Sequence, residues 1–111
     1  MRSGTRLKIE IESVDGSSFG ESFLTTNADE AFAFVSGNLQ PGFTIVIACI
    51  GSGVDYGNFV IDVVSTSVCN LRALEHRGFC FPGASAEQTF DALKYWLPQQ
   101  ERTPALTWQD E

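Results

Sequence analysis

A glycine-rich segment at residues 51–57 is the part of this chain whose composition most suggests ligand chemistry. Its sequence is Gly51-Ser52-Gly53-Val54-Asp55-Tyr56-Gly57. Such a loop holds a phosphate when it opens a helix, because the helix amide groups and dipole then meet the anion. Residues 58–66 are instead rich in β-branched side chains and have the length of a strand, and no Gly-Lys-Ser or Gly-Lys-Thr sequence follows the glycines. We therefore interpret residues 51–57 as a hairpin turn, with Asp55 and Tyr56 at an exposed tip that contacts a protein partner.

Histidine and cysteine are the other residue types that could do chemistry. His76 is the only histidine, and the cysteines Cys49, Cys69 and Cys80 are dispersed. Zinc ligands normally come in closely spaced pairs, so the pattern predicts no metal site. A cysteine nucleophile activated by His76 is an alternative, but base rates favour buried thiols and a solvated histidine. We predict no catalytic residue and no cofactor, and therefore a protein that is not an enzyme.

The charge of the chain limits its partners. Fourteen acidic side chains against seven basic ones give a formal charge of −7. Such a field repels phosphate backbones and anionic lipid, which argues against nucleic acid as a ligand, and it attracts a basic protein. Solubility alone is the alternative explanation of the acidity.

We recognise no targeting signal in the sequence, and this favours a location in the cytoplasm. Residues 1–5 are polar and do not resemble a signal peptide, and the longest apolar run, residues 45–50, is too short to span a bilayer. An odd number of cysteines without a secretion signal fits reduced thiols. We expect a cytoplasmic protein without a membrane segment.

The first half of the chain predicts two hairpins with a helix between them. Residues 7–12 alternate apolar and charged side chains, which is typical of a half-buried strand, and residues 19–26 return as its partner. Asn27 is placed to cap a helix that continues to Pro41. Residues 43–50 and 58–66 are apolar and β-branched, and they predict the second hairpin.

The second half contains one ambiguous segment and one clear helix. Residues 67–78 fit a short helix or an irregular strand equally well, whereas residues 79–81 look extended. Ser85 to Gln88 forms a capping box, and the helix that it starts runs to Pro98. Residues 104–108 suggest a last extended segment. The whole chain, residues 1–111, is then a single α+β domain in which a mainly antiparallel sheet of two hairpins packs against the intervening helix and a C-terminal helix.

Three large aromatic residues near the C-terminus are candidates for packing or for binding. Trp96 adjoins the apolar stripe of the last helix, so we expect it to pack in the core or at its edge. Tyr95 points elsewhere, and exposed aromatic side chains can anchor a protein partner. We name Tyr95 and Trp108 as candidate partner-binding residues, with packing as the alternative for each.

The C-terminal third of the chain has parts in a recognisable order. A helical segment of small, aromatic and aliphatic residues (92–97) precedes a polar turn (99–103), and then Pro104 precedes Trp108. This ending resembles that of a family of bacterial immunity proteins found beside polymorphic toxins, especially toxins with deaminase domains. The family's earlier order, a helix, a hydrophobic strand, a glycine-rich hairpin and a second strand, is similar to residues 28–64.

The resemblance implies a protein that binds a toxin and occludes its active site. An acidic surface would steer such a protein toward a nucleic-acid-acting toxin, whose cleft is expected to be basic. The next hypothesis is an interaction module that forms a homodimer through sheet edges or helix faces. A small enzyme comes third, because no nucleophile, base or metal set stands out.

Overall fold

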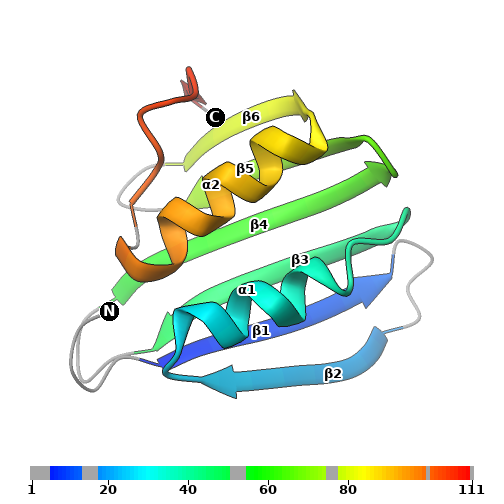
Figure 1. The fold of residues 1–111 in the computed structure, drawn as a ribbon, viewed down its shortest axis with the longest axis vertical. Coiled ribbons are helices and arrows are strands. Elements are labelled where there is room, and N and C mark those ends of the chain that lie inside the picture. Colours follow the sequence, from blue (N-terminus) through cyan, green and yellow to red (C-terminus); the bar gives the residue numbers. More distant parts are fainter. Residues whose placement is uncertain (1–5, 14–17, 51–54, 75–77, 100, 111) are drawn as a thin grey trace.

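The protein is an α+β domain in which one antiparallel sheet packs against two helices. The computed structural model describes residues 6–13, 18–50, 55–74, 78–99 and 101–110. Within them the elements are β1 (Arg6–Ser13), β2 (Ser18–Thr25), α1 (Ala28–Ser36), β3 (Phe43–Ile50), β4 (Asp55–Ser65), β5 (Val68–Leu74), β6 (Gly78–Ala84), α2 (Ala86–Gln99) and β7 (Gln109–Asp110). Both helices cover the same face of the sheet (Figure 1). The predicted α+β fold is confirmed.

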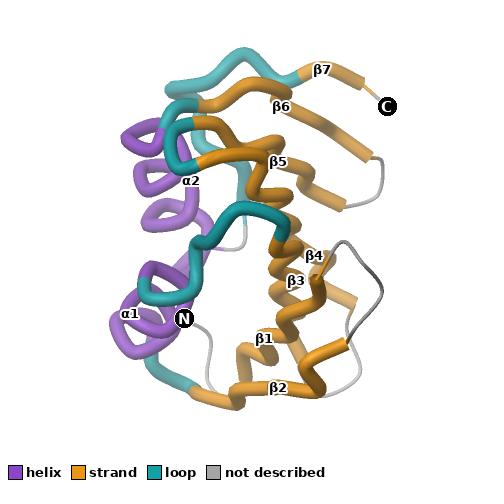
Figure 2. Tube along the Cα trace, turned by 90° about the vertical axis from the view of Figure 1, so that its right-hand side faces the viewer, coloured by secondary structure: helices purple, strands orange, loops and turns teal. Residues whose placement is uncertain are grey.

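The sheet has the strand order β2-β1-β3-β4-β5-β6-β7, and every neighbouring pair is antiparallel. β1 forms a hairpin with β2, and the chain then crosses the sheet as α1 to enter β3 on the other side of β1. Ile9 therefore has Phe23 on one side and Ile47 on the other. The sheet bends around the helices, so its helix-covered face is concave (Figure 2).

Alternation along the strands divides the sheet into a buried face and an open one. In β1 the side chains of Leu7, Ile9 and Ile11 are buried under the helices, because successive strand residues point to opposite faces. Lys8 and Glu10 lie between them on the open face, where the Lys8 Nζ and Glu10 Oε1 atoms are 2.9 Å apart. The alternation of residues 7–12 predicted this arrangement.

The core lies between the sheet and the helices. Phe59 of β4 and Trp96 of α2 are completely or almost completely buried, and their ring centroids are 5.6 Å apart. Each fully buried large apolar side chain contributes roughly 1.5–3 kcal/mol relative to an exposed one. The expected packing role of Trp96 is confirmed, and of its two alternatives the structure shows the core and not the edge.

Polar side chains start both helices as the sequence predicts. The Asn27 Oδ1 atom accepts hydrogen bonds from the backbone N–H groups of Asp29 and Glu30, at 2.8 and 3.1 Å. At α2 the Ser85 hydroxyl accepts from the Gln88 N–H at 3.1 Å, and the Gln88 side chain accepts from the Ser85 N–H at 3.0 Å. This reciprocal pair is the predicted capping box.

Over residues 68–74 the structure resolves the ambiguous segment in favour of a strand, and residues 75–77 lie outside the described residues. β5 pairs with both β4 and β6, and its buried side chains are Cys69, Leu71 and Ala73, at period two. The three-residue spacing of Val68, Leu71 and Leu74 does not reflect a helix, since pairing on both sides satisfies the backbone of β5 as a strand.

Several predicted boundaries are wrong, including the start of β4, which lies at Asp55 and not at residue 58. α1 ends at Ser36 with Gly37 as its cap, so the chain leaves the helix before Pro41. α2 continues one residue past Pro98. Residues 104–108 form turns and irregular backbone, and the extended pairing comes later, where β7 joins β6 through Cys80 and Gln109.

Candidate functional site

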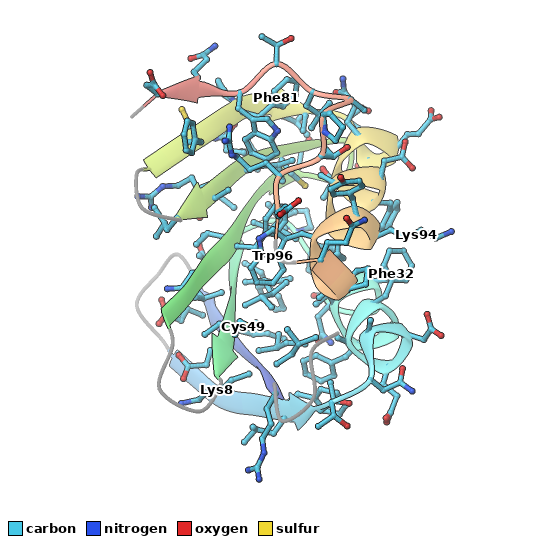
Figure 3. All side chains as sticks on the ribbon, turned by 90° about the vertical axis from the view of Figure 1, so that its left-hand side faces the viewer. Lys8, Phe32, Cys49, Phe81, Lys94 and Trp96 are labelled. Atoms are coloured by element: carbon cyan, nitrogen blue, oxygen red, sulfur yellow. The ribbon has the colours of Figure 1, made fainter. Side chains whose placement is uncertain are left out.

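A shallow hollow between the two helices is a candidate binding surface in the described part of the molecule. It has a volume of about 390 Å³ and is lined by Phe32 and Ser36 of α1 and by Phe90, Asp91 and Lys94 of α2. The Phe32 and Phe90 ring centroids are 5.9 Å apart, with their planes tilted by 55°. Figure 3 shows Phe32 and Lys94 on the helix side of the molecule, away from Lys8. We call these five residues the helix hollow.

Helical periodicity explains why these side chains meet. In α1, Ala31 and Val35 face the sheet and are fully buried, so Phe32 and Ser36 follow them on the flank of the helix. Residues four apart lie on one side of a helix, and Phe90 and Lys94 share that relation in α2. The two flanks face each other because both helices lie side by side on the same sheet face.

Acidic side chains predominate on the two helices that form the helix hollow. The first turn of α1 contains Asp29 and Glu30, and α2 contains Glu87 and Asp91, all of them exposed. Lys94 is the only basic residue in either helix. We call α1 and α2 together the helix layer. It has four negative charges and one positive charge, a net charge of −3. Acidic residues in a first helical turn also interact favourably with the helix dipole.

The polar groups of the hollow are not arranged for bond-breaking chemistry. The Ser36 hydroxyl donates to the Phe32 carbonyl of its own helix at 2.7 Å, so its proton is engaged by the backbone. Among the described residues, no three histidine, cysteine or acidic side chains come together as metal ligands. The arrangement can bind an apolar group flanked by positive charge.

The cysteines do not form a visible catalytic site either. Cys49 and Cys69 are buried and Cys80 is half-buried, and none of the three forms a disulfide in the structure. The base considered for them, His76, lies outside the described residues.

Trp108, a predicted partner-binding residue, is packed against the core. Its ring centroid lies 6.4 Å from that of Phe59 and 6.1 Å from that of Phe81, both in edge-on arrangements. The indole Nε1–H donates to the Thr103 carbonyl at 3.0 Å. These contacts leave the ring half-buried and favour the packing alternative.

The other predicted partner-binding residues are spread over the molecule. Tyr95 is half-buried on α2. Asp55 and Tyr56 are the first residues of β4, and Asp55 pairs with Ile50. The prediction that they belong to the turn is therefore wrong, because the strand pairing extends further toward the glycines than the β-branched run indicates. The structure does not describe their side chains. β3 and β4 pair as the predicted hairpin, so a strand follows the glycines and a phosphate loop is excluded. Residues 51–54 themselves lie outside the described residues.

Sequence reasoning did not identify the helix hollow, although a signal for it was present. Phe32 and Phe90 both belong to apolar helical stripes, and both turn out to be half-buried at the edge of those stripes. Only the placement of α1 beside α2 shows that the two rings line a common hollow.

Comparisons of this chain with protein-family models, with curated proteins and with solved structures found no match. Neither α1 nor α2, the helices in the described part of the chain, has the length and apolar character needed to cross a membrane. The function is therefore inferred from the surface and from the resemblance of residues 81–108.

Proposed function

We propose that this protein binds a basic protein through its helix layer and inhibits it by covering its active site. The observation that supports this proposal is the apolar helix hollow within an acidic helix layer. A few residues, often aromatic or arginine, supply most of the binding energy in typical interfaces, and surrounding charges set the partner and the rate of encounter.

The chemistry of the layer favours a protein partner over other ligands. The helix layer and the whole chain are both negative, so phosphate backbones and anionic membranes are repelled. A nucleic-acid-acting enzyme presents the opposite charge around its cleft, and it can offer arginine side chains that stack on Phe32 or Phe90 and pair with Asp91. This partner agrees with the resemblance to immunity proteins of polymorphic toxins.

Charge reversal at the helix hollow tests the proposal. The product of the adjacent gene would be purified, and its binding and activity measured with the wild-type protein and with Asp91→Lys. We expect Asp91→Lys to weaken binding about tenfold or more, mainly through slower association at low salt. The substitution Lys94→Glu, which removes the single positive charge of the layer, should bind at least as tightly as the wild type.

Glu12→Lys is the matched control, because it makes the same charge change at an exposed position of β1 on the uncovered sheet face. It should leave inhibition within about twofold of the wild type. Equal losses for Asp91→Lys and Glu12→Lys would show that net charge, and not the helix layer, determines binding. Absence of binding and inhibition for the wild-type protein would refute the proposed function.

A further inference from the structure

The sheet face that the helices leave uncovered is a second surface with an ordered pattern. Strand register places one row of side chains across it, in the order Glu10, Val46, Val60 and Arg72 from β1, β3, β4 and β5. We call the uncovered side of these four strands the outer sheet face. Val60 is only 6% exposed although no helix covers it, so its neighbours on the outer sheet face shield it.

The outer sheet face is electrically balanced, unlike the rest of the molecule. Among its described side chains, three are basic and three are acidic: Arg6, Lys8, Arg72, Glu10, Glu12 and Asp62. Their formal charges sum to zero, whereas the whole chain has −7. Two copies of an acidic protein repel each other, and they can approach through this face with less repulsion than through the helices, whose charge is −3.

The charges on the row are complementary to those of a second copy of the row in the opposite order. Glu10 lies one strand to one side of the Val46 and Val60 pair, and Arg72 lies one strand to the other side. Consider a two-fold axis that lies between two facing sheets, parallel to the strands and midway between β3 and β4. In the second copy this axis reverses the order of the four residues across the sheet. Glu10 of one copy then lies opposite Arg72 of the other, and Val46 lies opposite Val60.

We propose that a second copy of this chain binds the outer sheet face, with the strands of the two sheets aligned about this axis. Aligned sheets pack about 10 Å apart through interdigitating side chains. Because the sheet bends around the helices, its outer face is convex (Figure 2), so contact concentrates on the central strands that contain the row. The helix hollow lies on the opposite side of the molecule and stays free for another partner.

Adjacent rows fit the same axis. Thr44 and Asp62 are register partners on β3 and β4, and the Thr44 hydroxyl donates to Asp62 Oδ1 at 2.8 Å. Reversal places Thr44 of one copy opposite Asp62 of the other. It also places Lys8 opposite Leu74, where the aliphatic part of the lysine can cover an apolar neighbour.

Reciprocal charge exchange on the row tests the dimer and its axis together. Sedimentation equilibrium would be measured for the wild type, Glu10→Arg, Arg72→Glu and the double variant between about 1 μM and 1 mM protein. The wild type should change with concentration from the 12.1 kDa monomer toward twice that mass. Each single variant brings like charges together and should weaken dimerisation about tenfold or more, and the double variant should restore it.

Thermal unfolding of each variant separates loss of dimer from loss of fold. The Lys8–Glu10 ion pair is half-exposed and contributes little to stability, so the single variants should stay folded. Asp91→Lys, on the helix layer, is the matched control and should keep the wild-type dimer constant. The proposal would be overturned if the wild type stayed monomeric at every concentration. It would also be overturned if the single variants had the wild-type dimer constant, or if the double variant dimerised no better than the single variants.

Discussion

Trp108 offers a direct test of whether a large aromatic residue packs or binds. The substitution Trp108→Ala removes two edge-on ring contacts and one hydrogen bond from the indole to Thr103. The substitution Trp108→Phe keeps a ring and removes only the N–H donor. A packing role predicts that stability falls in the first variant and falls less in the second.

The expected magnitudes follow from the contacts. Truncating a fully buried aromatic residue to alanine costs about 3–5 kcal/mol. Trp108 is half-buried, so we expect a loss of about 2–3 kcal/mol, to which the ring pairs contribute up to about 1.5 kcal/mol each. Loss of the hydrogen bond alone should cost Trp108→Phe about 1 kcal/mol. Domains of this kind are stable by only about 5–15 kcal/mol, so the larger effect is easily measured.

Urea unfolding followed by far-UV circular dichroism would measure these losses without depending on tryptophan fluorescence. Thr107→Ala is the control, since the neighbouring Thr107 is exposed and should change stability by less than about 0.5 kcal/mol. Should Trp108→Ala prove as stable as Thr107→Ala, the packing role would be refuted. Lost binding with unchanged stability would identify Trp108 as a partner anchor.

Two further predictions concern the backbone. Replacing Asn27 by Ala leaves two first-turn N–H groups of α1 without their acceptor, so it should lower the free energy of unfolding by about 1 kcal/mol. Asn27→Asp keeps an acceptor oxygen and should retain most of the wild-type stability. Equal stabilities of the wild type and Asn27→Ala in chemical denaturation would contradict the capping role. Gly42 has a φ of +88°, and no atom of the described residues lies within 4 Å of the place that an alanine Cβ would take there, so Gly42→Ala should cost about 1–2 kcal/mol from backbone strain alone. Gly37→Ala, at a φ of −76°, should be neutral or stabilising, and a matching loss at Gly37 would show that strain is not the cause.

Much of the fold was predictable because its signals are local. Alternation in residues 7–12 identifies a half-buried strand wherever that strand lies in the sheet, since side chains of a strand always have period two. Ser85 and Gln88 begin α2 through hydrogen bonds within four residues of each other. The two strands beside the glycines likewise excluded a phosphate loop without reference to other parts of the chain.

The secondary structure of residues 67–78 could not be predicted from local sequence signals. Its apolar spacing permits a helix, and β5 forms because β4 and β6 offer hydrogen bonds on both sides. The position of β1 between β2 and β3 was not predictable for the same reason, because the pairing of β1 with β3 depends on α1 crossing the sheet.

The surfaces proposed for binding were decided by tertiary structure alone. The sequence by itself determined an acidic α+β domain, its helix starts and most of its strands. It did not place Phe32 beside Phe90, which lie on different helices, or align Glu10, Val46, Val60 and Arg72, which come from four strands. Such groupings arise when distant segments pack on a common sheet, and their energies depend on neighbours that no short stretch of sequence contains.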